Sequence, residues 1–104
     1  MTEPSEVISR LTKITAVFNY PDGKAAMKAL QVGHEVILVR EPSNPYDANA
    51  IQVWARSPDY PAVRLGPQLG YIPKEVAANL KDKTLLGAEK HHSAWDAIVI
   101  HYKE

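Results

Sequence analysis

The chain contains no cysteine, which excludes disulfide frameworks, thiolate zinc sites and cysteine nucleophiles. It also has no net charge, because 12 lysines and arginines are balanced by 12 aspartates and glutamates. A domain that binds long nucleic acids without sequence preference usually carries a basic excess, since neutralised phosphates supply most of its affinity. Any nucleic-acid site on this chain is therefore expected to be small and local.

Long apolar runs are missing too, so no segment is expected to span a membrane. The first six residues, MTEPSE, are polar and acidic, unlike a secretory signal. The sequence has no repeat, no low-complexity tract and no linker rich in glycine or serine. We expect a soluble, cytoplasmic chain in which residues 1–9 form a flexible arm and residues 10–104 form one domain.

The hydrophobic pattern predicts a mainly β fold with one or two short helices. Strands are predicted over residues 11–18, 34–40, 49–55, 69–72 and 94–102. One helix is predicted over residues 24–30, with Asp22 as its cap and Gly33 at its end. A second begins at Pro73 (PKEVAANLKDK), and residues 57–67, with three prolines, are predicted to form a loop. Several short strands in so small a chain suggest an OB-like or SH3-like barrel, with residues 34–40 and 49–55 as antiparallel neighbours.

The segment between those two strands carries many polar side chains. Residues 38–54 read LVREPSNPYDANAIQVW, whereas a hairpin turn needs only two or three glycine, asparagine or aspartate residues. Ordinary turn chemistry is one explanation, because Asn44, Asp47 and Asn49 can bond their own backbone and Tyr46 can cover the edge of the core. A ligand site is the other.

The segment VREPSNPYDANAIQV, followed by LGYIPKEVAANL, resembles the HIRAN domain family, found in eukaryotic fork-remodelling helicases and as small bacterial proteins. The family signature is an R-E-P-x-N-P-Y-D-x-N-A-I core and then a G-Y-I-P corner where a strand meets a helix. The resemblance extends weakly from about residue 13 to residue 102. It implies an OB-like barrel that, in the characterised eukaryotic members, binds the 3′ end of single-stranded DNA.

This resemblance assigns roles to the polar segment. Tyr46 matches the tyrosine beside the terminal nucleotide, where a stacked base contributes on the order of 1–3 kcal/mol. Asp47 matches the acid that accepts a hydrogen bond from the 3′-hydroxyl, and Asn44 belongs to the same motif. Because a carboxylate accepts from a hydroxyl and repels a phosphate, one acid would distinguish the end of a strand from its interior.

The second motif, GYIPK at residues 70–74, places a helix N-terminus, Tyr71 and Lys74 at one corner, which suits a phosphate. In the family, basic and aromatic residues at this corner contact the DNA backbone; otherwise Tyr71 would be a core residue and Lys74 a solvated one. Trp95, at the start of the last predicted strand, matches an aromatic residue that stacks on a base in the DNA-binding relatives. Core packing is its alternative role.

The chain departs from the DNA-end binders at the end of the first predicted strand. Those relatives have an arginine and a tyrosine there, whereas this chain has Phe18, Asn19 and Tyr20. Tyr20 is a candidate to replace the tyrosine. The arginine has no counterpart, and Arg10, Lys13 or Lys24 could supply the missing phosphate contact. The loop over residues 56–69 also looks longer than in those relatives.

No enzyme, metal or cofactor is expected. His92 and Asp96 in HHSAWD are four residues apart, but that spacing binds metal on a helix, and this segment is predicted as a loop entering a strand. His91 and His92 would point to opposite faces of a strand. The sequence also has no nucleophile motif, glycine-rich phosphate loop or helicase motif.

The sequence and the resemblance together predict a module that recognises the 3′-hydroxyl end of single-stranded DNA, in DNA repair or at replication forks. RNA is not excluded, and a helicase or nuclease is a possible partner. The alternative is a protein- or peptide-interaction barrel, accessory to a larger DNA-processing protein, with Tyr46, Tyr71 and Trp95 lining its groove. Asp47 together with Lys74 favours nucleic acid, because a peptide groove needs no acid beside a phosphate-binding corner.

Overall fold

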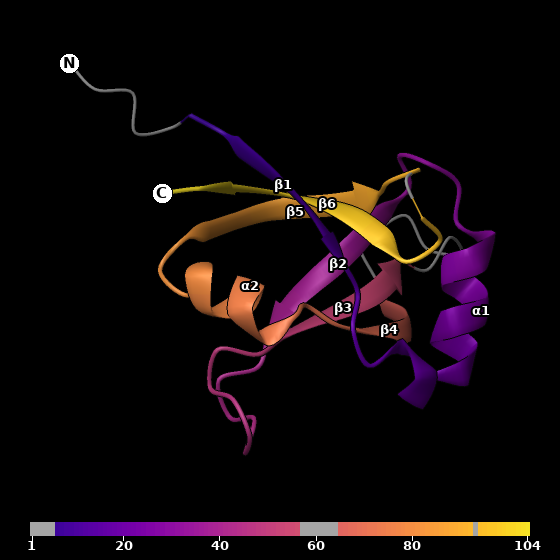
Figure 1. Cartoon of the computed structure of the whole chain (residues 1–104), viewed down its shortest axis with the longest axis horizontal. Helices are drawn as coiled ribbons and strands as arrows, with labels where there is room; N and C mark the ends of the chain where they lie inside the picture. Colours follow the sequence, from indigo (N-terminus) through magenta and orange to yellow (C-terminus); the bar gives the residue numbers. More distant parts are fainter. Residues whose placement is uncertain (1–5, 57–64, 93) are drawn as a thin grey trace.

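The structure is a computed structural model that describes residues 6–56, 65–92 and 94–104. These residues form one six-stranded antiparallel sheet in the order β1-β6-β5-β2-β3-β4, with two short helices and one turn of 3-10 helix (Figure 1). The elements in chain order are β1 (Ile8–Lys13), η1 (Val17–Asn19), α1 (Pro21–Ala29), β2 (Glu35–Arg40), β3 (Ile51–Arg56), β4 (Leu65–Tyr71), α2 (Lys74–Asn79), β5 (Thr84–Lys90) and β6 (Ala97–Lys103). The mainly β class predicted from the sequence is confirmed.

The two outer strands of the sheet meet at a narrow seam, which curls the sheet towards a barrel. Just beyond β1, the Thr15 amide donates to the Tyr71 carbonyl at 2.8 Å, and the Tyr71 amide donates to the Thr15 carbonyl at 2.9 Å. Gly70 allows this approach: its φ is 152°, and a Cβ at this position would lie 2.4 Å from the Thr15 carbonyl oxygen. The seam therefore joins β4 to the chain that leaves β1.

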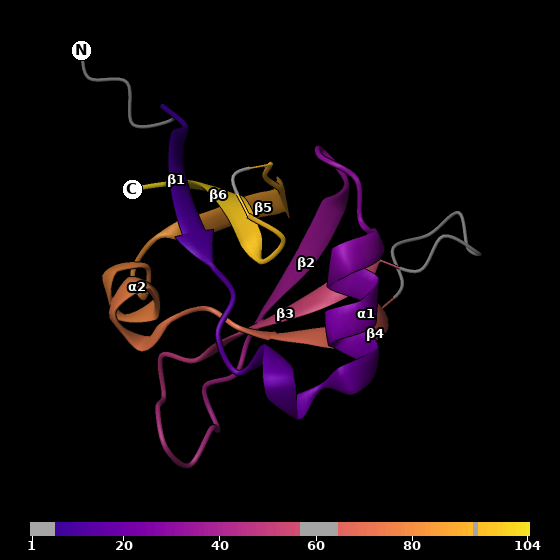
Figure 2. The same ribbon diagram turned by 45° about the vertical axis from the view of Figure 1, so that its right-hand side comes forward.

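The core lies inside the curled sheet, where α1 packs against β4 and β3, and α2 adds buried Val76 and Ala77 (Figures 1 and 2). Along β3, Ile51, Val53 and Ala55 are buried and alternate with half-buried Gln52 and Trp54, as the sequence pattern predicted. The largest fully buried side chains are Met27, Ile51, Leu69, Leu80, Ile98, Ile100, Val36 and Val53. They come from α1, from the residue that follows α2, and from the four strands β2, β3, β4 and β6, so one shared core holds the fold together.

The central hairpin agrees with the sequence, whereas the first strand does not. β2 and β3 pair antiparallel, with Val36 opposite Ala55. β1 begins at Ile8, so residues 8 and 9 belong to the sheet and not to the predicted arm; residues 1–5 lie outside the described ranges. Residues 17–19 form η1 instead of continuing the strand, because Ala16 has a φ of 62° and turns the chain. Pairing with the apolar strand β6 makes residues 8–13 a strand.

Both helices differ from the prediction at their ends. α1 starts at Pro21, so Asp22 lies in its first turn and does not cap it; Gly33, with a φ of 89°, follows in the turn before β2. α2 has six residues and ends at Asn79, shorter than the predicted helix. Across the described ranges, no helix is long and apolar enough to cross a membrane.

The later strands also have different limits. β4 begins at Leu65, which removes residues 65–67 from the predicted loop; residues 57–64 lie outside the described part of the chain. β5 was missed because its residues, TLLGAEK, do not alternate cleanly, and the structure has a register shift between Leu85 and Gly87. β6 begins at Ala97, so residues 94–96 form a turn and not the start of the strand.

Candidate functional site

The loop between β2 and β3, residues 41–50, is ordered by its own side chains. Asn44 Oδ1 accepts hydrogen bonds from the backbone amides of Tyr46, at 2.8 Å, and Asp47, at 3.0 Å. Asp47 Oδ1 accepts from the Asn49 amide at 2.9 Å. These contacts are turn chemistry of the kind the sequence suggested as one explanation. They also fix the positions from which Tyr46 and Asp47 project.

Glu41 ties this loop to β4. Its Oε1 accepts a hydrogen bond from Asn44 Nδ2 at 3.0 Å and another from the Tyr71 hydroxyl at 2.8 Å. The Asn44 bond, followed by the Tyr71 bond, lowers the pKa of Glu41, and the same Glu41 carboxylate raises the pKa of Tyr71. Glu41 is therefore charged and Tyr71 protonated at neutral pH. Glu41 is the acid of the R-E-P motif, and no role for it was predicted from the sequence.

The loop and the GYIPK corner at residues 70–74 border a surface hollow of about 280 Å³. The hollow is lined by Thr15, Asn44, Tyr46, Asp47, Ala50, Tyr71, Ile72 and Lys74. Five of the seven predicted site residues thus lie together. Tyr46 is 91% exposed, so its ring is free to receive a partner. Thr15 and Ala50 are lining residues that the sequence did not indicate.

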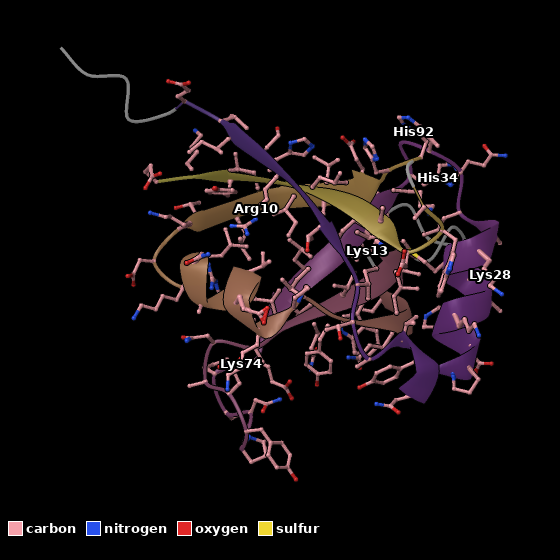
Figure 3. All side chains as sticks on the ribbon, in the orientation of Figure 1. Arg10, Lys13, Lys28, His34, Lys74 and His92 are labelled. Carbon is pink, nitrogen blue, oxygen red and sulfur yellow. The ribbon has the colours of Figure 1, made fainter. Side chains whose placement is uncertain are left out.

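Lys74 supplies the positive charge at this corner. It is the exposed first residue of α2 and lies beside the loop (Figure 3). Among the described residues, its ammonium has no hydrogen bond or ion pair. Because α2 has six residues, its dipole adds little, and Lys74 itself carries most of the attraction for an anion. The predicted phosphate corner therefore depends more on the side chain than on the helix terminus.

Comparison with known protein families shows to which family the chain belongs. The model of the HIRAN domain family matches residues 11–100, a range that contains both the loop and the GYIPK corner. The chain belongs to the HIRAN domain family.

Two solved structures are similar to this HIRAN domain. One is the HIRAN domain of human HLTF, with 21% identity and a TM-score of 0.59, covering 90% of this chain and 72% of the other. The other is a protein from Lactobacillus plantarum, with 21% identity and a TM-score of 0.65, covering 94% and 95%. At this identity the likeness shows the fold, and it confirms the OB-like class. No curated protein matches the chain.

Tyr20 borders the hollow of this HIRAN domain without lining it. Its ring centroid lies 6.4 Å from that of Tyr71, with the two planes tilted by 47°. Tyr20 lines a second hollow of about 260 Å³, with Asn19, Pro21, Asp22, Gly23, Pro67 and Gln68. The ring contact therefore places Tyr20, a residue of the second hollow, next to Tyr71, a residue of the first.

Trp95 is not part of the hollow. It lies in the turn between β5 and β6 and not at the start of the last strand, where the sequence placed it. It is 36% exposed, and Lys28 Nζ of α1 lies 5.6 Å from the centroid of its ring. The turn is held by Lys90, whose buried Nζ donates to the carbonyls of Ala94 and Trp95; burial lowers the pKa of Lys90. Trp95 is thus a surface residue beside α1 and not a core residue.

Two other features of the sequence, the arginine of the R-E-P motif and the adjacent histidines, have structural contacts. Arg40 Nη2 donates to the carbonyls of Leu80 and Lys83, at 2.8 and 2.7 Å, and so anchors the turn after α2. The rings of His91 and His92 stack with centroids 4.5 Å apart, which corrects the expectation that they point to opposite faces. They follow the end of β5, where strand alternation no longer applies. The described ranges contain no group of three or more histidines and acids able to hold a metal.

Proposed function

We propose that this HIRAN domain binds the 3′-hydroxyl end of single-stranded DNA in the hollow between the loop and the corner. The family is one of nucleic-acid-binding modules, which supports the class of ligand. The observation that carries the proposal is that Asp47, Lys74 and the exposed Tyr46 line one hollow. Together they offer an acceptor, a cation and an aromatic ring to one terminal nucleotide.

Asp47 is the proposed sensor of the end. One of its oxygens, Oδ1, is occupied by the Asn49 amide, which holds the carboxylate in place. The other oxygen makes no hydrogen bond with any residue in the described ranges, so it can accept from the 3′-hydroxyl. A 3′-phosphate, or the phosphodiester of an internal nucleotide, would bring negative charge to this position and be repelled.

The other residues orient the nucleotide. Tyr46 stacks on the terminal base or bonds a phosphate, and a stack is tolerant of base identity. Lys74 binds the phosphodiester on the opposite side from the acid. Asn44 holds the amides of Tyr46 and Asp47 in place. Tyr71, with Tyr20 beside it, forms the wall against which the sugar rests, and Trp95 stacks on a base further along the strand.

We propose no catalytic role for the domain. In a DNA repair or replication-fork context, any hydrolysis of ATP or of DNA would belong to a partner, such as a helicase or nuclease, and the domain would supply recognition of the end in the cytoplasm. Stacking and hydroxyl recognition apply to RNA as well, so an RNA end of the same sequence belongs in the same experiment.

The test is fluorescence anisotropy with short single-stranded DNA that ends in either a 3′-hydroxyl or a 3′-phosphate. The informative variant is Asp47→Asn, because the amide oxygen can keep the bond to the Asn49 backbone while the charge is lost. Exposed Asp82, in the turn after α2, gives the control Asp82→Asn. We expect the wild type and the control to prefer the hydroxyl end by about tenfold or more, as for a hydrogen bond to a charged group.

Asp47→Asn should lose most of that preference. Equal binding of both ends by the wild type would refute end recognition. If neither oligonucleotide binds, a salt-insensitive interaction with a peptide would favour the aromatic peptide groove instead.

A further inference from the structure

The chain that leaves β1 connects the two aromatic parts of the proposed site. At Thr15 it forms the seam with Tyr71, and Thr15 itself lines the hollow. One residue earlier, the Ile14 amide donates to the Asp96 carbonyl at 2.9 Å, directly after Trp95. Two backbone contacts thus place the end of β1 between the hollow and the turn that carries Trp95.

Lys13 is the cation on this connecting segment. Lys13 and Thr15 are both exposed, whereas Ile14 between them is buried, so the two exposed side chains share one face of the extended chain. A separation of two residues in extended chain is about 7 Å. Lys13 is also paired with Ala97, two residues after Trp95. It therefore lies next to both the hollow and the turn.

The charge of Lys13 is available to a ligand. Within the part of the chain that the structure describes, its ammonium has no hydrogen bond and no ion pair, and Figure 3 shows it at the end of β1. The acid of the neighbouring turn, Asp96, interacts instead with buried Lys90: burial lowers the pKa of Lys90, and the charge of Asp96 opposes this lowering. Arg10 is three residues earlier and partly buried, on the alternate face of β1. Lys13 is thus better placed than Arg10 to contact an anion between the hollow and Trp95.

We infer that Lys13 binds the second phosphodiester from the 3′ end and guides the strand from the hollow to Trp95. This inference rests on the proposed function and extends it from one nucleotide to a short track. The terminal nucleotide occupies the hollow with its own phosphodiester at Lys74, the next phosphodiester lies at Lys13, and a more distant base stacks on Trp95. Lys28, next to the Trp95 ring, adds positive charge at the far end of the track.

The track predicts a dependence on ligand length. A six-nucleotide DNA reaches Lys13 and Trp95, whereas a dinucleotide fills the hollow and ends there. We expect Lys13→Gln to weaken binding of the six-nucleotide DNA about three- to tenfold, and to reduce the slope of log K against log salt by about 0.7. Binding of the dinucleotide, and the preference for the 3′-hydroxyl, should stay as in the wild type.

Lys81→Gln is the matched control. Lys81 is an exposed lysine in the turn after α2, at the opposite end of that helix from Lys74, and its loss should change neither affinity nor salt slope. Tryptophan fluorescence of a Trp54→Phe variant, which keeps Trp95, gives an independent readout. The six-nucleotide DNA should quench it and the dinucleotide should not.

An unchanged salt slope in Lys13→Gln would overturn the inference, as would an equal loss of affinity for both DNA lengths. Failure of end recognition is a separate result. If 3′-hydroxyl and 3′-phosphate ends bind equally but the longer DNA still binds better in a way that depends on Lys13, the inference about the track stands and only end recognition is wrong. If no oligonucleotide binds, both proposals are wrong.

Discussion

Replacing Gly70 with alanine is expected to open the seam that closes the sheet. The new Cβ would lie 2.4 Å from the Thr15 carbonyl oxygen and 2.7 Å from Ile14 Cγ2. Real Cβ atoms essentially never come this close to another heavy atom, so the chain after β1 must move. That movement would lengthen the two hydrogen bonds between Thr15 and Tyr71.

The cost can be divided into two parts. A φ of 152° is unfavourable for alanine and costs of the order of 1–3 kcal/mol. Overpacking against Thr15 and Ile14 adds about 1–3 kcal/mol. The total, about 2–6 kcal/mol, is a large share of the roughly 5–15 kcal/mol by which a domain of this size is stable.

Gly87 provides the matched control. Its φ is 147°, nearly that of Gly70, but a Cβ there would meet no atom within 4 Å. Gly87→Ala therefore has the backbone cost without the clash, and the difference between the two variants, about 1–3 kcal/mol, measures how closely the seam is packed.

The measurement is urea unfolding of the wild type and both variants, followed by far-ultraviolet circular dichroism. If the free energies of unfolding of the two variants differ by less than about 0.5 kcal/mol, the seam is not closely packed and the reasoning fails. Because the seam positions Thr15 and Tyr71 in the hollow, Gly70→Ala should also weaken binding of a 3′-hydroxyl end more than Gly87→Ala does, under conditions where both are folded.

Three further predictions concern stability. Arg40→Met should lower the free energy of unfolding by about 1–3 kcal/mol, because it removes a charged donor from the Leu80 and Lys83 carbonyls. The Leu80 carbonyl keeps the Lys83 amide at 3.1 Å. Arg56→Met, which breaks an exposed ion pair, should cost less than about 1 kcal/mol in the same urea experiment. The Tyr71 hydrogen bond to Glu41 raises the folded-state pKa of Tyr71, so its contribution is full below the ordinary value of 10.0 and is lost as pH rises through the higher folded value. Tyr71→Phe should therefore flatten the alkaline fall in unfolding free energy, and an unchanged alkaline limb would contradict the assignment. The pKa of Glu41 is lowered, first by Asn44 and then by Tyr71, so its contribution is present above 4.5, is lost as pH falls through the folded value, and should be absent in Glu41→Gln.

Much of the loop could be predicted from the sequence because its contacts are local. Asn44 bonds amides two and three residues ahead, and Asp47 bonds the amide two residues ahead. Such bonds depend only on the backbone of one turn, so the residue types at that spacing are enough to indicate them. The alternation of Ile51, Val53 and Ala55 is equally local, and it predicted the buried face of β3 correctly.

Contacts between distant segments were beyond reach of the same reasoning. Glu41 and Tyr71 are 30 residues apart, and nothing in either segment indicates that their side chains share a hydrogen bond. β5 was missed because a strand with a bulge loses its period, and it becomes a strand only through pairing with β2 and β6. The start of β1 at Ile8 likewise depends on β6 as its partner.

The sequence by itself determined the family, the mainly β class and the chemical character of the loop, since these follow from residue types at short spacing. The tertiary structure decided which of those side chains meet. Strand register and the Gly70 seam bring Thr15 and Tyr71 to the loop, place Lys13 opposite Ala97, and turn Arg40 towards α2. The reason is that register is set by packing of the whole core, and a shift of one residue in any strand would send every side chain on it to the opposite face.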